Sequence, residues 1–301
     1  MQKAPVRSNA RELPVGTAII TIHFRRKEMT DPVVAHYSGG ASLVDVIAEN
    51  LRSAGKELAA LRTSDLVRFD EFHIRGRKAT LELAQQMNLG EDSHVLDIGS
   101  GLGGPARTLA EEHGCHVTGI DLTPSFCEAA TAMSNWVGLG RRVVFQQADA
   151  TNLPFADNQF DAAMTIHVAM NIPAKDQMYA EARRVVKPGG IFAIYDVLQG
   201  EGGEVLLPVP WAREQSINYL VTPNQMMSLL HDAGFNIRAV QDSTEESQKF
   251  FEAMILRMEQ TGTAPVRWQM FLGDDFPIMV RNQVRNVAER RIRTVSYICE
   301  V

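Results

Sequence analysis

Residues 94–121 read HVLDIGSGLGGPARTLAEEHGCHVTGID, and the rest of the chain can be organised around this stretch. An apolar run at residues 95–98 leads into a glycine-rich turn at 99–104, after which a helix is expected from about Pro105. A second apolar run ends on Asp121. The order strand, glycine turn, helix and strand predicts a βαβ unit of the kind that binds a nucleotide-like cofactor.

The glycines of this turn have a mechanical purpose, because a chain that passes directly from a strand into a helix needs positive φ angles or no Cβ. Gly99, Gly101 and Gly104 also satisfy GxGxxG, the fingerprint of nicotinamide dinucleotide sites, so this pattern alone is weak evidence. Asp97 distinguishes a dinucleotide from a cationic ligand, since an ionised carboxylate repels a pyrophosphate but attracts an amino group or a sulfonium. Asp121 is expected to accept hydrogen bonds from ribose hydroxyls.

Two later blocks accompany the glycine turn. The stretch VLDIGSGLGG followed by GIDLT resembles the cofactor-binding signature of class I S-adenosylmethionine-dependent methyltransferases. Residues 149–161, DATNLPFADNQFD, and residues 183–197, RRVVKPGGIFAIYDV, are similar to later motifs of that family, in order and at the family's spacing. The resemblance covers roughly residues 69–241 and is closest to the sarcosine/dimethylglycine and tocopherol methyltransferase group of small-molecule enzymes.

The resemblance implies an α/β fold with a Rossmann-like, doubly wound, mostly parallel seven-stranded sheet, helices on both faces and an α-helical cap. Alternating strands and helices along the chain favour the same architecture. Strands are expected at residues 143–147, 160–166, 191–196, 236–240 and 293–299. Helices are expected at residues 42–61, 76–87, 125–137, 175–186, 223–232, 245–260 and 277–290. Residues 187–190 are expected to form the turn before the fifth strand, and residues 199–219 an irregular segment.

Four regions follow from this pattern. Residues 1–28 are expected to be a poorly ordered extension in which only residues 17–24 alternate like a strand. Residues 29–89 would supply helical cap elements, and residues 90–243 the cofactor-binding core. Residues 244–301 would hold the final strand and a helical insertion of roughly 50 residues, which we expect to cover the substrate opening.

The composition of the chain limits the classes of partner that are expected. The chain has 301 residues, 45% hydrophobic and 22% charged, and a formal net charge of -6 with acids and bases interspersed, which disfavours a nucleic-acid partner. Its three cysteines show no CxxC spacing and no clustering with histidine, which argues against a zinc site or a disulfide framework. No run approaches the roughly 18 apolar residues of a membrane helix. We therefore expect a cytoplasmic protein without metal or membrane partners; the sequence does not indicate its oligomeric state.

The resemblance also implies a cofactor site for S-adenosylmethionine. The backbone of the glycine turn, with Asp97 nearby, is expected to hold the methionine moiety, Asp121 both ribose hydroxyls, and Asp149 the adenine edge. The expected cofactor-binding residues are Asp97, Gly99, Ser100, Gly101, Gly103, Asp121, Leu122, Asp149, Ala150 and Ile166. The alternative is that the acids only cap helices or end strands.

A histidine and several aromatic residues are candidates for the acceptor side of the site. His167 follows the fourth strand, where related enzymes bring the transferring methyl, so it would orient the acceptor or take its proton as a general base. The expected substrate-pocket residues are Tyr37, His73, Asn171, Tyr195 and Trp211, with Phe72, Arg75 and Tyr219 as further candidates. Ordinary packing is the alternative for each of them.

The implied reaction is direct displacement of the methyl group of S-adenosylmethionine by an oxygen, nitrogen, sulfur or carbon nucleophile of a small molecule, which releases S-adenosylhomocysteine. The leaving group is already activated by its positive charge, so the protein contributes mainly alignment and exclusion of water. Two alternatives remain open. One is a protein of the same fold without methyl transfer, a cyclase or binding module; the other, with less support, is an NAD-dependent dehydrogenase.

Overall fold

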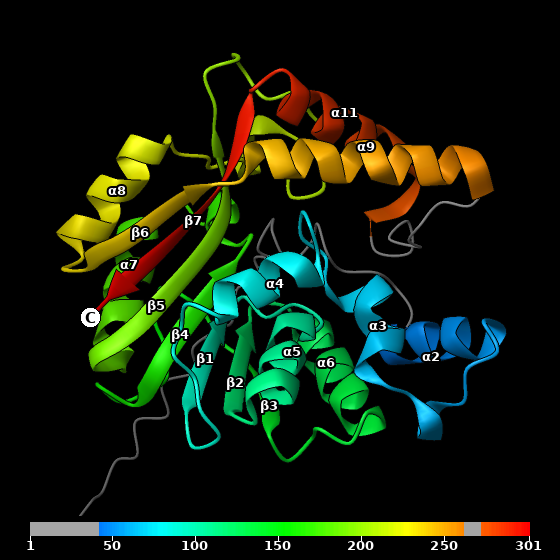
Figure 1. Ribbon diagram of the computed structural model, residues 1–301, viewed down its shortest axis with the longest axis horizontal. Helices are drawn as coiled ribbons and strands as arrows, with labels where there is room; N and C mark the ends of the chain where they lie inside the picture. Colours follow the sequence, from blue (N-terminus) through cyan, green and yellow to red (C-terminus); the bar gives the residue numbers. More distant parts are fainter. Residues whose placement is uncertain (1–41, 262–271) are drawn as a thin grey trace, which may run out of the picture. The chain divides into compact units, whose positions relative to one another are not determined.

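The structure, a computed structural model, describes residues 42–261 and 272–301. Its strands form a seven-stranded sheet in the order β3-β2-β1-β4-β5-β7-β6 (Figure 1). Strands β1 to β5 pair in parallel, whereas β7 is antiparallel to both of its neighbours, β5 and β6. The predicted fold class is confirmed. The expected extension at residues 1–28, its strand at 17–24, and Tyr37 lie outside the described residues.

The strands are β1 His94–Ile98, β2 His116–Asp121, β3 Val143–Gln147, β4 Phe160–Ile166, β5 Val186–Gln199, β6 Asn236–Asp242 and β7 Ile292–Glu300. The expected turn at residues 187–190 is wrong, because these residues lie within β5 at a register shift against β4. Gly189 there has φ +80°, and its N–H donates a hydrogen bond to the carbonyl of Val301, while the N–H of Val301 donates to the carbonyl of Gly190. The C-terminal residue thus holds a segment that local sequence marks as a turn.

The described α-helices are α2 Leu43–Ser53, α3 Thr63–Asp70, α4 Arg77–Ala84, α5 Gly104–His113, α6 Pro124–Trp136, α7 Lys175–Val185, α8 Pro223–Asp232, α9 Thr244–Thr261 and α11 Phe276–Ala288. The single helix expected at residues 42–61 is wrong. Helix α2 ends at Ser53, and Gly55 follows with φ +76°, a left-handed conformation that interrupts a right-handed helix. A short 3₁₀ turn, Leu58–Ala60, and the unpredicted helix α3 come next.

Alternating residues of the central strands face two different cores. Leu96 of β1 packs in a cluster that includes buried residues of α7 and α8, whereas its neighbour Val95 packs in a cluster that includes residues of α4 and α5. Helices therefore cover both faces of the sheet, as expected of a largely parallel sheet. A further cluster joins α2 and α3 to α6.

The segment between β5 and α8 is irregular, as predicted. It contains a single described 3₁₀ turn, Gln215–Ile217, and an isolated bridge between Val209 and Ala212. Trp211 anchors this segment in a third core, which also contains Phe251 of α9 and Val287 of α11. The late helices therefore pack against the same segment that leads from the sheet towards the site.

Candidate functional site

A cavity of about 480 Å³ lies at the carboxyl ends of β1, β2 and β4. Its first wall consists of the glycine turn and the strand ends, at residues 99–102, 120–123, 148–151 and 166–168. Its second wall consists of Asp70, Phe72, His73, residues 171–174, Ile217, Tyr219 and Leu272. The volume is within the range of about 300–1,000 Å³ that is typical of small-molecule sites. The position follows the rule that ligands bind outside the carboxyl ends of parallel strands.

Two other hollows, of about 520 and 630 Å³, share Leu61 and Val137 in their linings. Both are wide open to solvent, and neither is lined by a strand end. The strand-end cavity is therefore the candidate site.

Two glycines of the turn, Gly99 and Gly104, are required by close packing. Gly99 has φ +77°, and a Cβ there would clash with the side chain of Val168, which follows β4. A Cβ on Gly104 would clash with the carbonyl of Asp70 at the end of α3. Gly104, the third glycine of GxGxxG, thus leaves space for the end of α3 and not for a ligand. Gly103 has φ +76° but does not line the cavity, contrary to the expectation that it contacts the cofactor.

Asp121 connects the turn to the end of β2. Its Oδ2 accepts a hydrogen bond from the backbone N–H of Gly101 at 2.9 Å, and its Oδ1 accepts one from that of Thr123 at 2.8 Å. Burial raises the pKa of this carboxyl above its ordinary value. Each carboxylate oxygen can accept a second hydrogen bond, so Asp121 can still receive hydroxyl donors from the cavity that it lines.

Asp97 lies in the protein interior next to the turn, 2% exposed, and is not part of the cavity wall. Its Oδ2 has no hydrogen-bond partner among the described residues. Burial, together with the nearby carboxyls of Glu71 and Asp121, raises the pKa of Asp97 to about 8. A buried carboxyl oxygen without a donor is costly, so this group is a candidate partner for a positively charged ligand.

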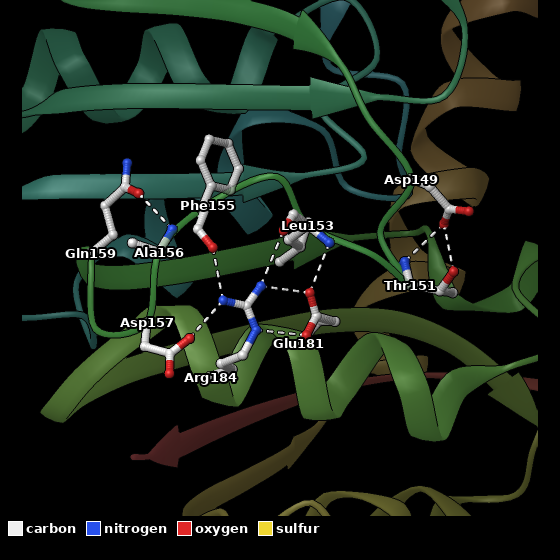
Figure 2. A network of polar contacts seen from close by, with 9 residues as sticks. All are labelled: Asp149, Thr151, Leu153, Phe155, Ala156, Asp157, Gln159, Glu181 and Arg184. Carbon is white, nitrogen blue, oxygen red and sulfur yellow. Dashed lines mark hydrogen bonds and ion pairs between the residues drawn. The ribbon is translucent and has the colours of Figure 1, made fainter. Parts of the chain in front are cut away.

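Asp149 and Ala150 line the cavity from the loop that follows β3. The Asp149 Oδ1 accepts hydrogen bonds from the backbone N–H of Thr151 at 2.8 Å and from its hydroxyl at 2.7 Å (Figure 2). The other carboxylate oxygen of this exposed side chain is unused in these contacts. Leu122 and Ile166, which are expected to bind the cofactor, also lie in the first wall.

The rest of the loop after Asp149 is held by Arg184 of α7, as Figure 2 shows. The guanidinium donates to the carbonyls of Leu153 and Phe155, at 3.1 and 2.7 Å, and pairs with the carboxylates of Asp157 and Glu181. Sequence reasoning missed this arrangement, because the partners are separated by up to 31 residues.

His167 sits where β4 ends and has φ +55°, a left-handed backbone conformation that is uncommon outside glycine. Its backbone N–H donates to the carbonyl of Tyr195 on β5 at 2.8 Å. Its imidazole lines the cavity, and Nε2 finds no partner within the part of the chain that the structure describes. Burial, with a smaller contribution from His73, lowers the pKa of His167 well below its ordinary value. The ring is therefore neutral near pH 7.

The expected substrate-pocket residues divide into two groups. His73 and Asn171 line the cavity, although the Asn171 amide already donates to the carbonyl of Trp211 at 2.7 Å. Trp211 is a correction: it is buried in the third core, and its indole N–H donates to Asn218 Oδ1 at 3.0 Å. Tyr195 is also outside the cavity wall, but its ring centroid lies 5.0 Å from that of His167.

The further candidates are divided in the same way. Phe72 and Tyr219 belong to the second wall, whereas the buried Arg75 pairs with Glu82 of α4. Leu272 is a described residue of the late insertion that lines the cavity, and sequence reasoning did not name it. Its position between the two late helices, α9 and α11, carries no local signal for a site. Among the described residues no cluster of three or more histidine, cysteine or acidic side chains could hold a metal ion.

Comparisons with known proteins agree with this geometry. A family model described as a methyltransferase domain matches residues 96–194. Sterol 24-C-methyltransferase ERG6B of Gibberella zeae is 39% identical over 116 residues, which are 38% of this chain and 30% of that one. Methyltransferase GfsG of Streptomyces halstedii is 37% identical over 123 residues, which are 41% and 44% of the two chains. The chain matches less than half the length of these relatives.

Solved structures share the fold at lower identity. Phosphoethanolamine N-methyltransferase 2 of Haemonchus contortus, in complex with S-adenosyl-L-methionine, superposes with a TM-score of 0.66 and 20% identity over 87% of this chain and 60% of that one. The [4+2]-cyclase SpnF superposes with a TM-score of 0.59 and 24% identity, covering 85% and 92% of the two chains. The sheet order, the glycine turn with its two acids and the matched domain support one conclusion. Residues 96–194 match a methyltransferase domain, and the chain is similar to class I S-adenosylmethionine-dependent methyltransferases in that domain and in its fold.

Proposed function

We propose that this protein transfers the methyl group of S-adenosylmethionine to an oxygen, nitrogen, sulfur or carbon nucleophile of a small molecule. The observation that carries the proposal is the pair of strand-end acids around the glycine turn. Asp121 lines the cavity with lone pairs to spare, and Asp97 keeps a buried carboxyl oxygen without a donor. A ligand with hydroxyls at one position suits Asp121, and an ammonium group held at the glycine turn would lie on the side of Asp97, which is next to the turn but outside the cavity wall.

The residues present fit this cofactor. Gly101 lines the cavity without a Cβ, which allows close approach, and the ammonium group of the methionine moiety is a donor of the kind that Asp97 lacks. Asp121 would hold the ribose, and Leu122 and Asp149 would contact the adenine. The cofactor supplies a methyl group on a positively charged sulfur. The chain then has to align the acceptor and exclude water, and the neutral imidazole of His167 can accept a hydrogen bond from the acceptor.

Calorimetric titration with S-adenosylhomocysteine tests the cofactor assignment. We expect binding to the unaltered protein, and affinity at least tenfold weaker for Asp121→Ala, because hydrogen bonds to a charged group contribute about 1.5–3 kcal/mol each. Asp232→Ala is the matched control, since that side chain is 81% exposed on α8. Equal affinity of all three proteins would refute the assignment. Circular dichroism of Asp121→Ala separates lost binding from lost folding.

A second candidate is a protein that keeps the cofactor fold without transferring a methyl group. The likeness to the [4+2]-cyclase SpnF, which spans most of both chains, favours keeping it open. Incubation of the protein with methyl-labelled S-adenosylmethionine and a metabolite extract distinguishes the two. Labelled product supports the methyltransferase, whereas tight cofactor binding without any labelled product supports the second candidate.

We further propose that the protein works in the cytoplasm. Cys115, Cys127 and Cys299 are free and buried, and burial raises the pKa of each thiol. Unpaired cysteines are typical of reducing compartments. None of the described helices is long and apolar enough to cross a membrane. Fractionation of the source cells, followed by immunodetection in the cytosolic fraction, tests the location.

A further inference from the structure

The second wall of the cavity contains groups that cofactor binding leaves unused. Phe72, Ile217, Tyr219 and Leu272 form an apolar and aromatic surface, and His73 adds an imidazole. The charged side chains among the described lining residues are all acidic, namely Asp70, Asp121 and Asp149. An anionic group in this cavity would therefore meet repulsion and no described partner of opposite charge.

The ammonium group of Lys175, next to the second wall, already has hydrogen-bond partners. Lys175 opens α7 and is buried, and its Nζ donates to the carbonyls of Ile172 and Tyr219 at 2.7 and 2.5 Å. It thereby ties two segments of the second wall together. Because its ammonium group already serves these carbonyls, we do not expect it to bind an acceptor's phosphate or carboxylate.

The tautomer of His73 follows from its contacts. The Nε2 atom lies 3.0 Å from the carbonyl oxygen of Gly76, which can only accept, so Nε2 carries the hydrogen. The Thr80 hydroxyl, 3.2 Å from Nε2, donates its own hydrogen to Glu71 at 2.8 Å and so accepts at most a share of the same N–H. The lone pair of the neutral ring is consequently on Nδ1. No hydrogen bond within the described residues engages that atom.

His73 is held neutral in spite of a nearby carboxylate. Glu71 lies 3.6 Å from Nε2, but its oxygens accept hydrogen bonds from Thr80 and Thr108. Burial lowers the pKa of His73 to about 4; the negative charge of Asp70 opposes this shift, and the positive charge of Arg75 adds to it. The side chain therefore offers an uncharged acceptor next to an apolar wall, 5.8 Å between ring centroids from His167.

We propose that Nδ1 of His73 selects the methyl acceptor, and that this acceptor is an uncharged, largely apolar molecule that presents a hydroxyl group. The hydroxyl donates its hydrogen to Nδ1, and the apolar body lies against the aromatic second wall. Phosphorylated and carboxylated acceptors are disfavoured. This inference rests on the proposed function, because it assigns the space that the cofactor does not fill.

Three matched probes test the proposal on the full chain saturated with S-adenosylhomocysteine: 2-naphthol, 2-methoxynaphthalene and 2-naphthyl phosphate. They share one ring body and differ in a hydroxyl donor, a capped oxygen and an anion. We expect the unaltered protein to bind 2-naphthol about tenfold more tightly than either of the others, as titrated by fluorescence, since a site built for a hydroxyl rejects analogues that leave its acceptor unpaired. Failure of all three to bind, or equal affinity for the three, overturns the proposal.

The variant His73→Gln assigns the preference to Nδ1. Glutamine retains an amide N–H that can serve the Gly76 carbonyl. Its one acceptor, Oε1, is bonded to the same carbon as that nitrogen and so cannot take the place of Nδ1, and we therefore expect the preference for 2-naphthol to disappear. Affinity for S-adenosylhomocysteine should stay within about twofold of the unaltered protein, which shows that the variant folds. His231→Gln, at a side chain that is 85% exposed, is the control and should behave like the unaltered protein.

Two results separate this inference from the proposed function. If the protein ignores S-adenosylhomocysteine, the proposed function fails and this inference fails with it. If the cofactor analogue binds but His73→Gln keeps the 2-naphthol preference, only this inference fails. A preference that survives in His73→Gln and disappears in His167→Gln would transfer the role to His167 and overturn the assignment made here.

Discussion

Replacing Asp97 by asparagine should make the cofactor-free protein more stable, although it removes a residue of the proposed cofactor site. The carboxyl is 2% exposed, and one of its oxygens has no described partner. Burial, with repulsion from Glu71 and Asp121, raises its pKa from 3.8 to about 8. Asparagine has nearly the same shape and no charge to desolvate, so the substitution removes the cost of burying a carboxylate and keeps the packing.

The sign and the size follow from proton linkage. Between pH 4 and pH 8 the folded protein retains a proton on Asp97 that the unfolded chain has released, so stability falls as pH rises through this window. One pKa unit corresponds to about 1.4 kcal/mol. The cost at Asp97 is therefore about 2 kcal/mol near pH 5.5 and about 5 kcal/mol near pH 8. Asp97→Asn should lack this pH-dependent term.

Urea denaturation of the cofactor-free protein at pH 5 and pH 8 measures the effect. We expect Asp97→Asn to exceed the unaltered protein in free energy of unfolding, by an amount that grows with pH. Asp232→Asn, on an 81% exposed side chain, serves as the control and should show no growing difference. An Asp97→Asn advantage that is independent of pH, or a less stable variant at pH 8, would refute the reasoning about burial.

The same variant should bind S-adenosylhomocysteine more weakly, because the ammonium group of the ligand would lose a carboxylate partner. Binding near pH 7 should also release a proton from Asp97 in the unaltered protein, since the ligand's positive charge lowers the raised pKa. Calorimetry in buffers of different ionisation enthalpy detects this proton. If Asp97→Asn releases as many protons as the unaltered protein when the ligand binds, another group is responsible.

Two further predictions concern the clamped loop and the packing beneath the glycine turn. Arg184→Leu should lower the free energy of unfolding by about 1–3 kcal/mol and weaken cofactor binding, because it frees residues 152–159. Arg183→Leu loses one 3.4 Å hydrogen bond and should change neither quantity. Equal effects of the two variants in denaturation and in cofactor titration would contradict the role of Arg184. Gly119→Ala puts a methyl group 2.5 Å from the Phe145 ring, so the variant should lose about 1–3 kcal/mol of stability and melt at a lower temperature. The double variant with Phe145→Leu should recover part of the lost thermal midpoint. A midpoint that does not recover would exclude overpacking as the cause.

The parts of the structure that were predicted correctly are those that neighbouring residues control. The glycine turn with positive φ at Gly99, and strands β1 to β4, follow from apolar runs that end at turn residues. The start of α8 was also predicted: Thr222 caps it, Gln225 completes the capping box, and Pro223 occupies the first helical position. These features depend on contacts within a few residues, so the order of residue types alone determined them.

Other features were decided by contacts between distant segments, which residue order does not reveal. Trp211 became a core residue because helices from the late insertion pack on it, and the early start of β5 depends on hydrogen bonds to Val301. The neutral state of His73, with its lone pair on Nδ1, needs a carbonyl, a hydroxyl and burial that act together. Sequence therefore determined which cofactor class this protein suits. Tertiary structure decided which side chains reach the cavity and in what protonation state, because desolvation and hydrogen bonding arise only when distant parts of the chain meet.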